Sequence, residues 1–187
     1  MKGVLEMCQK TQTIKKLVLT SCISSITDEF DPNRVYNETH WNETSSLARN
    51  SYAFSKTEQE KFAWNYVKDP KCSFKFVSIL PGTVLGPHLN TQRLSQSHKF
   101  ILSCLTKNSR RIANLNFAIS DVRDVAIAHI FAIEDGDILG RYCLCNEAKH
   151  LAAILQIIHE NFEEIHVPTM PIRDFAVRLK DSINNCA

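Results

Sequence analysis

Two dense apolar runs on either side of a helical pattern set most of what this chain can fold into. The runs, Leu17-Val18-Leu19 and Phe74 to Leu80, are rich in β-branched and aromatic residues, which favours buried strands. Between them, residues 52–67 have the spacing of an amphipathic helix that ends before Asp69-Pro70. A strand, a helix and a strand in this order predict a parallel crossover, so we expect an α/β fold with a doubly wound parallel sheet and flanking helices.

The alternation continues along the rest of the chain. Residues 22–50 are rich in Ser, Thr, Asn and Asp and predict a long loop, and loops of this length usually serve a site. Apolar spacing predicts further helices at about residues 4–8, 94–105, 122–133 and 151–162, and a short strand at 142–145.

Composition excludes two classes of partner. A chain of 187 residues with 44% hydrophobic and 22% charged residues is long enough for one domain with a substantial core. The net charge of +2 comes from 22 basic and 20 acidic residues that are interspersed, so no basic footprint of a nucleic-acid or membrane-surface binder is present. No stretch reaches the roughly 18 to 20 apolar residues of a membrane helix. We therefore expect no nucleic acid and no membrane as partner.

Cysteine usage indicates a reducing compartment. The seven cysteines form neither a C-x-x-C motif nor a cluster with histidine at metal-ligand spacing. The opening residues, MKGVLEMCQKTQTIKK, have charges too close to their few apolar residues for a secretory signal. We therefore expect reduced thiols, no metal site and a cytoplasmic location.

Topology points to a site before any motif is considered. In doubly wound sheets, ligands bind beyond the carboxyl ends of the strands. Three stretches are expected at that edge: residues 20–25 after the first strand, the helix start around Tyr52, and residues 81–84 after the second strand.

Tyr52 and Lys56 form a pair with possible acid–base chemistry. Four residues apart on a helix, their side chains share one face, and a nearby ammonium favours the phenolate of a tyrosine whose ordinary pKa is about 10. A tyrosine tuned in this way can exchange a proton with a carbonyl or an alcohol near neutral pH. The spacing alone is a weak signal and also fits a helix start with a solvated lysine, so both interpretations stay open at this point.

Five collinear segments carry a resemblance to a known family. The chain resembles the extended short-chain dehydrogenase/reductases of the NAD-dependent epimerase/dehydratase superfamily, most of all the branch of dihydroflavonol reductases and cinnamoyl-CoA reductases. The likeness covers residues 3–165 and implies a Rossmann-like fold and an NADP-dependent oxidoreductase that acts on a small carbonyl or alcohol substrate. The segments are KKLVLTSCISSI, HWNETSSLARNSYAFSKTEQEKFAW, FKFVSILPGTVLGPHL, DVRDVAIAHIFAIE and GRYCLC.

The resemblance implies a role for individual residues. Tyr52 matches the family's general acid, and Lys56 matches the lysine that lowers the tyrosine pKa and binds the nicotinamide ribose. Ser21 and Cys22 stand where the family polarises the substrate oxygen. The Gly140-Arg141-Tyr142 stretch matches a region that we expect to be structural. For the cofactor, NADP with NAD as the other candidate, the matching residues are Tyr52, Lys56, Pro81, Gly82, Thr83 and Val84.

Two departures from the family pattern bear on activity. The family's catalytic serine is replaced, because the chain has Thr20-Ser21-Cys22 and cysteine is a much weaker hydrogen-bond donor. Either Ser21 or Ser24 takes the serine's place, or Cys22 does, or Cys22 is only a small thiol at a strand end. The five glycines, at positions 3, 82, 86, 136 and 140, cannot form the family's glycine-rich phosphate-binding turn.

We therefore interpret the sequence as an N-terminally truncated form of the fold that lacks the first strands. Residues 1–187 are expected to be a single partial domain, with 1–145 as the catalytic half and 146–187 as the start of a C-terminal substrate-binding region. Two classes of function remain: a reductase with Tyr52 as acid, or a non-catalytic remnant that binds a protein partner or itself through an exposed sheet edge. Among enzymes, hydroxysteroid dehydrogenases and sugar-nucleotide epimerases are the alternatives.

Overall fold

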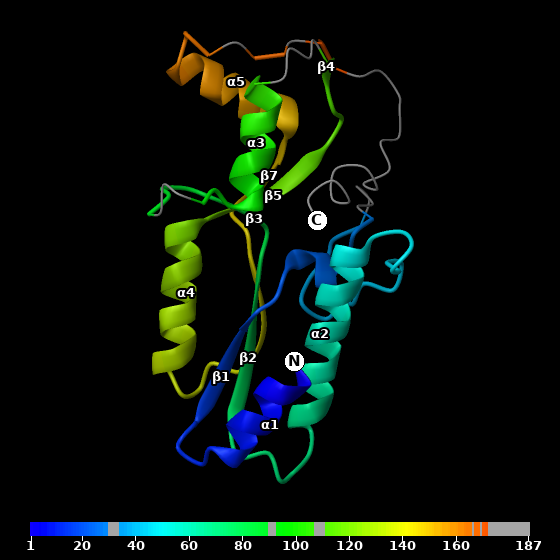
Figure 1. Cartoon of the computed structure of the whole chain (residues 1–187), viewed down its shortest axis with the longest axis vertical. Coiled ribbons are helices and arrows are strands. Elements are labelled where there is room, and N and C mark those ends of the chain that lie inside the picture. Colours follow the sequence, from blue (N-terminus) through cyan, green and yellow to red (C-terminus); the bar gives the residue numbers. More distant parts are fainter. Residues whose placement is uncertain (30–33, 90–92, 107–110, 166, 169, 172–187) are drawn as a thin grey trace. The chain divides into compact units, whose positions relative to one another are not determined.

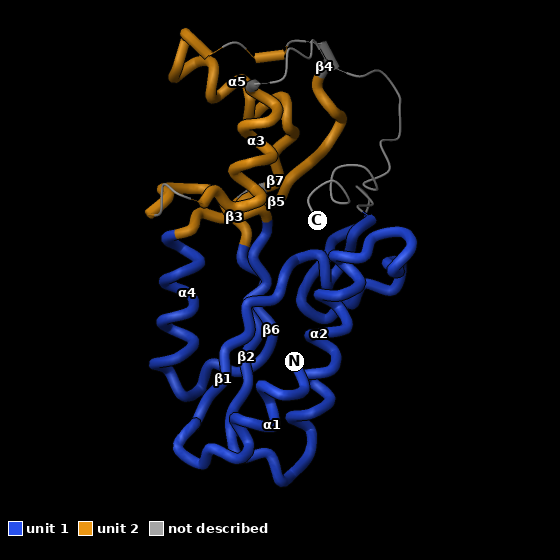
Figure 2. The backbone as a smooth tube through the Cα atoms, viewed as in Figure 1, with its two compact units in different colours: residues 1–82, 123–144 blue, residues 83–122, 145–187 orange. Residues whose placement is uncertain are grey.

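The chain forms two compact units. A computed structural model describes residues 1–29, 34–89, 93–106, 111–165, 167–168 and 170–171. Unit 1 consists of Met1–Gly82 and Arg123–Leu144, and unit 2 of Thr83–Val122 and Cys145–Ala187 (Figure 2). Each unit is described by itself below. The single partial domain expected from the sequence, with its boundary after residue 145, stays a prediction.

Unit 1 is built on a three-stranded parallel sheet. Its strands are β1 (Lys16–Thr20), β2 (Lys75–Pro81) and β6 (Gly140–Leu144), in the order β1-β2-β6. In the register of the central strand, Val18 is opposite Val77 and Ile79 is opposite Tyr142. Parallel pairing through crossover connections confirms the doubly wound α/β class that the sequence predicts.

Helices cover both faces of this sheet (Figure 1). On one face, α1 (Lys2–Lys10) and α2 (Ser51–Val67) enclose a buried cluster that includes Leu5, Ala63 and Phe76. On the other face, α4 (Val122–Glu134) contributes Ala132 to a second cluster with Val77 and Ile79. Strand β2 is buried from Phe76 to Pro81 and is mostly apolar, as is typical of a central parallel strand, with Ser78 as its buried polar residue.

The long loop of unit 1 is organised by one buried carboxylate. After the short 3₁₀ turn η1 (Ile23–Ser25), Asp28 accepts hydrogen bonds from the Asn42 amide at 3.0 Å, the Thr44 hydroxyl at 2.8 Å and the Asn50 amide at 3.0 Å. The Asn50 side-chain oxygen in turn accepts from the backbone N–H of Ala53 at 3.1 Å and so caps α2. The loop therefore determines where α2 begins.

In its described residues, unit 2 is a mixed sheet with two helices. Strand β5 (Asn116–Asp121) pairs in parallel with β3 (Thr83–Leu85) and antiparallel with β7 (Glu147–His150). The helices α3 (Gln96–Thr106) and α5 (Leu151–Asn161) match the sequence prediction, and β4 (Arg111–Ile112) pairs with β8 (Met170–Pro171). The core of this unit is formed by Ile112, Leu151, Leu155 and Val167.

Two kinds of feature are missing from the described part of the chain. Within those ranges no helix has the length and apolar character to cross a membrane. The same residues contain no group of three or more His, Cys, Asp or Glu side chains arranged to hold a metal ion.

Candidate functional site

The start of α2 lies at the carboxyl end of β1. Tyr52 stands in the first turn of the helix with 44% of its surface exposed. One turn later, the Lys56 Nζ donates a hydrogen bond of 3.2 Å to the carbonyl oxygen of Thr20, the last residue of β1. The helix start and the strand end are therefore neighbours, as the topology of a parallel sheet predicts.

Cys22 is the side chain that meets Tyr52. Its backbone is extended, with φ −157° and ψ 148°, and its Sγ accepts the backbone N–H of Ser24 at 3.4 Å. The Cys22 thiol donates to the Ser24 hydroxyl at 3.4 Å, and it lies close enough to the Tyr52 phenol to act on its pKa. Sequence reasoning named Cys22 as one of several candidates for this position, and the structure brings it next to the phenol.

The pKa of Tyr52 moves upward. Burial of the phenol is the largest cause, and the charge of a Cys22 thiolate and the hydrogen bond with Cys22 raise the pKa further. The direction is opposite to the lowering expected from Lys56. Tyr52 is therefore a neutral phenol at physiological pH, which is the form that donates a proton.

Ser21 points away from this pair. It is 3% exposed, and its hydroxyl donates a hydrogen bond of 2.6 Å to Oε2 of Glu60. Its backbone N–H donates to the carbonyl of Ile79 at 2.8 Å. Of the two neighbouring candidates for the polarising group, Cys22 therefore contacts Tyr52 and Ser21 contacts the interior.

The turn proposed to meet the cofactor begins at the end of the central strand. Pro81 is the last residue of β2, and the N–H of Gly82 donates to the carbonyl of Leu144 at 3.1 Å. Thr83 and Val84 open β3 in unit 2, where they pair with Ile119 and Ser120. The part of these four residues in a cofactor site stays a prediction.

A buried ion pair was missed by sequence reasoning. Glu60 of α2 is fully buried, and the Arg141 Nε of β6 donates to its Oε1 at 2.8 Å. The hydroxyls of Ser21, Ser25 and Ser78 also donate to Glu60, at 2.6, 2.5 and 2.6 Å. Burial acts to raise the pKa of Glu60, but these hydrogen bonds outweigh it and the net pKa lies below its ordinary range. The available signal was the spacing Tyr-x-x-x-Lys-x-x-x-Glu, which adds Glu60 to the face of Tyr52 and Lys56.

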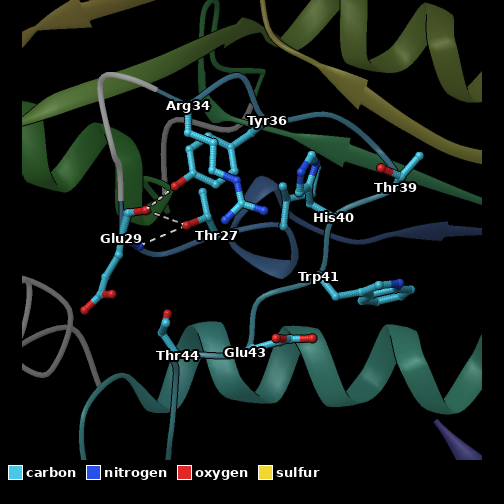
Figure 3. Close-up of a pocket in the computed structure, with 10 residues that line it drawn as sticks. Thr27, Glu29, Arg34, Tyr36, Thr39, His40, Trp41, Glu43 and Thr44 are labelled. Atoms are coloured by element: carbon cyan, nitrogen blue, oxygen red, sulfur yellow. Dashed lines mark hydrogen bonds between the residues drawn. The ribbon is translucent and has the colours of Figure 1, made fainter.

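The loop of unit 1 lines an open pocket of about 580 Å³ (Figure 3). Tyr36, His40 and Trp41 supply its aromatic lining, and Arg34 and Glu43 contribute charges. This cavity contains neither Tyr52 nor Lys56. Those two residues line a separate groove of about 620 Å³ together with Met1, Lys2 and Phe62. The groove is the better candidate for chemistry, because it contains Tyr52, the proton donor predicted from the sequence.

A dinucleotide fits this set of residues at one end only. The Tyr52 hydroxyl and the Lys56 ammonium are suited to the ribose and nicotinamide end of NADP, as hydrogen-bond donors on one helix face. A pyrophosphate needs a glycine turn between a strand and the start of a helix. The glycines lie elsewhere: Gly3 is in α1, Gly82 and Gly86 flank β3, Gly136 follows α4 and Gly140 begins β6.

Comparison with known proteins identifies the family of the chain. The model of a family described as the NAD dependent epimerase/dehydratase family matches residues 1–144. A cinnamoyl-CoA reductase of Medicago truncatula is 32% identical over 171 residues, which are 89% of this chain and 51% of the relative. A dihydroflavonol 4-reductase of Gerbera hybrida is 28% identical over 89% of this chain and 46% of its own length.

Solved structures show the same partial coverage. Gre2 of Candida albicans in complex with NADPH superposes with a TM-score of 0.79 at 29% identity, over 97% of this chain and 58% of that protein. A vestitone reductase from alfalfa, at 20% identity and a TM-score of 0.74, shares the fold. The chain spans about half the length of the curated relatives that it matches.

Proposed function

The chain belongs to the NAD dependent epimerase/dehydratase family. We therefore propose that it acts as an NADP-dependent reductase of the cinnamoyl-CoA or dihydroflavonol reductase type. Its substrate would be a small carbonyl compound of aromatic or apolar character. The observation that carries the proposal is the position of Tyr52 one turn before Lys56, whose ammonium donates to the carbonyl of Thr20 at the carboxyl end of a parallel sheet.

Tyr52 is the proton donor in this proposal. The raised pKa keeps its hydroxyl protonated but makes the phenol a weaker acid, so it gives its proton to the substrate oxygen only as negative charge develops there during reduction. The Lys56 ammonium would stabilise the phenolate that remains. The reduced nicotinamide, when bound, supplies the hydride that the carbonyl carbon takes up. Hydride and proton together convert the carbonyl into an alcohol.

Cys22 would orient the phenol and polarise the substrate oxygen weakly. Its thiol donates a weaker hydrogen bond than a serine hydroxyl, so we expect a slower reaction than a serine at this position would give. Ser21 is the second candidate from the sequence, and its hydroxyl would first have to leave the carboxylate of Glu60.

The cofactor in this proposal is NADP, with NAD as the alternative. Support comes from the solved NADPH complex of Gre2 from Candida albicans, which is 29% identical to this chain. Lys56 would bind the ribose, and the turn from Pro81 to Val84 would meet the nicotinamide carboxamide.

Calorimetric titration of the 187-residue chain with NADPH and NADH tests the proposal. We expect binding that Lys56→Ala weakens about tenfold or more, as for the loss of a hydrogen bond from a charged group. The matched control is Lys68→Ala, because Lys68 is exposed at the far end of α2. Binding that is insensitive to Lys56, or no binding of either dinucleotide at millimolar concentration, would contradict the proposal for this chain.

The sheet edge supports the second candidate, a protein that binds a partner or itself. Among the described strands, β1 pairs with β2 alone, so its outer edge is open. The α4 helix beyond this sheet exposes Ile127, Ile130 and Phe131, each by 47% or more. Open edges and apolar faces of this kind favour association. Sedimentation velocity over a range of concentrations tests this candidate, and a monomer at every concentration would contradict self-association.

A further inference from the structure

We propose that Glu60 and Arg141 are positioning residues, which fix the segment Thr20–Cys22 against the helix that carries Tyr52. Glu60 holds the strand end directly, and Arg141 extends the same anchor to residues 38–41 of the loop. The proposal rests on the proposed function only in regarding Tyr52 and Cys22 as the reacting pair.

Tyr52, Lys56 and Glu60 follow one another at intervals of four residues on α2. Residues at this spacing lie above one another on a single helix face. Each of them contacts a different member of one short segment. Lys56 holds the Thr20 carbonyl, Glu60 holds the Ser21 hydroxyl, and Tyr52 meets the Cys22 thiol.

The hydrogen bond between the Ser21 hydroxyl and Glu60 is the strongest of the three contacts. Hydrogen bonds to a charged acceptor are shorter and stronger than those between neutral groups, and this one measures 2.6 Å inside the protein. The other two contacts lie at the partly exposed end of the helix, where water competes. The position of Cys22 opposite Tyr52 therefore depends chiefly on its neighbour Ser21 and on Glu60.

Glu60 is itself fixed from other directions. Ser78 of β2 donates to Oε1, Ser25 of η1 donates to Oε2, and Arg141 of β6 donates to Oε1. A buried carboxylate that lost these partners would be strongly unfavourable, so its orientation is narrowly defined. The sheet thereby sets the rotamer of Glu60, and Glu60 sets the strand end.

Arg141 connects Glu60 to residues 38–41 of the loop. Its Nη1 donates to the carbonyls of Glu38 and His40, the latter at 2.7 Å, and its guanidinium lies 3.6 Å from the ring centroid of Trp41. The Glu38 carboxylate accepts the backbone N–H of Cys143 at 3.0 Å. His40 and Trp41 line the loop cavity, so the wall of that cavity is tied to the same carboxylate as the reacting pair.

A matched pair of serine variants separates positioning from general stabilisation. Ser21→Ala and Ser78→Ala each remove one buried hydroxyl that donates to Glu60 at 2.6 Å, but only Ser21 adjoins Cys22. The measurement is the rate at which iodoacetamide alkylates Cys22, resolved by mass spectrometry. Two other free thiols serve as references: Cys145 is exposed, and Cys8 is buried and reports general opening.

We expect Ser21→Ala to speed alkylation of Cys22 about tenfold relative to Cys145, as for the loss of one hydrogen bond to a charged group. Ser78→Ala should leave that ratio within about twofold of the wild-type value, and Cys8 should stay protected in both variants. Equal acceleration by the two variants, or acceleration of Cys8 in parallel with Cys22, would overturn the proposal.

The role of Arg141 in holding residues 38–41 is tested separately. Arg141→Lys keeps the charge but loses the planar fork that serves Glu60 and two carbonyls at once. We expect amide hydrogen exchange of residues 38–41 to become about tenfold faster, with exchange of α4 unchanged. Unchanged protection of residues 38–41 would remove Arg141 from the proposal. Neither measurement needs cofactor or substrate, so a failure of NADPH binding would count against the proposed function alone.

Discussion

The Nζ of Lys56 lies 3.2 Å from the carbonyl oxygen of Thr20, so the amine that accompanies Tyr52 is tied to the end of β1. Because this hydrogen bond is exposed, its loss should affect folding little. We expect Lys56→Ala to lower the free energy of unfolding by about 1 kcal/mol or less in urea titrations. A loss several times larger would mean that Lys56 is a structural element of the helix start.

Tyr52 should ionise only in strongly alkaline solution. The absorbance difference between the wild type and Tyr52→Phe isolates this phenol, and its midpoint should lie well above the ordinary tyrosine pKa of about 10. The group's contribution to stability is complete below that ordinary value and is lost as the pH rises through the folded-state pKa. Cys22→Ala should lower the midpoint, because the charge and the hydrogen bond of Cys22 both raise it. A midpoint near 10 in the wild type would refute the assignment.

Glu60→Gln should be among the most destabilising conservative changes in unit 1. It leaves the Arg141 guanidinium buried without its counter-ion, which costs about 3 kcal/mol or more in other proteins. Urea unfolding at neutral pH measures the loss, and the exposed Glu58→Gln on the same helix should change stability by roughly 0.5 kcal/mol or less.

The loss of stability at acidic pH should also depend on Glu60. Its folded-state pKa is lowered, so its contribution is present above the unfolded value of about 4.3 and is lost as the pH falls through the folded value. This part of the pH dependence should disappear in Glu60→Gln. An unchanged acid limb would show that other carboxylates dominate it.

Asn50→Ala should weaken the start of α2. The variant removes the cap on Ala53 and one hydrogen bond to Asp28, and loss of such a cap costs about 1 kcal/mol. Thermal unfolding compared with Asn65→Ala, an exposed position within the same helix, gives the measurement. Equal stability of the two variants would argue against a role of the loop in starting α2.

Cys22→Ser should accelerate any carbonyl reduction that the chain performs. A hydroxyl is a stronger donor than a thiol, and one donor to a developing oxyanion contributes about a hundredfold in well-studied enzymes. NADPH consumption with a panel of aromatic aldehydes provides the assay. If Cys22→Ser were no faster than Cys22→Ala, this position would have no part in polarising the substrate.

Much of unit 1 could be predicted because its patterns are local. The apolar runs gave β1 and β2, and the helical spacing gave α2 within one residue at its start. The edge at which Cys22, Tyr52 and Pro81 lie followed from parallel topology alone. These features need only near neighbours in sequence.

The remaining elements depend on distant partners. Strand β5 has the sequence NFAISD, which mixes polar and apolar residues. It pairs with β7, which lies about 30 residues later in the chain, so local sequence does not indicate the pairing. The hydrogen-bond partners of Glu60 were equally hard to predict, because Ser78, Ser21 and Arg141 stand 18, 39 and 81 residues away from it in the sequence. A carboxylate on a helix is ordinarily solvated, so the helical spacing that adds Glu60 to the face of Tyr52 and Lys56 was not enough to predict its burial.

The carboxylate of Asp28 has a consequence for recognition. It accepts hydrogen bonds from Asn42, Thr44 and Asn50, so residues 42–50 are held in place by contacts within the protein. A molecule that docks against residues 42–50 does not have to immobilise them, and the entropy lost on binding is correspondingly smaller. Selectivity there would come from rigid shape complementarity rather than from adaptation of the chain.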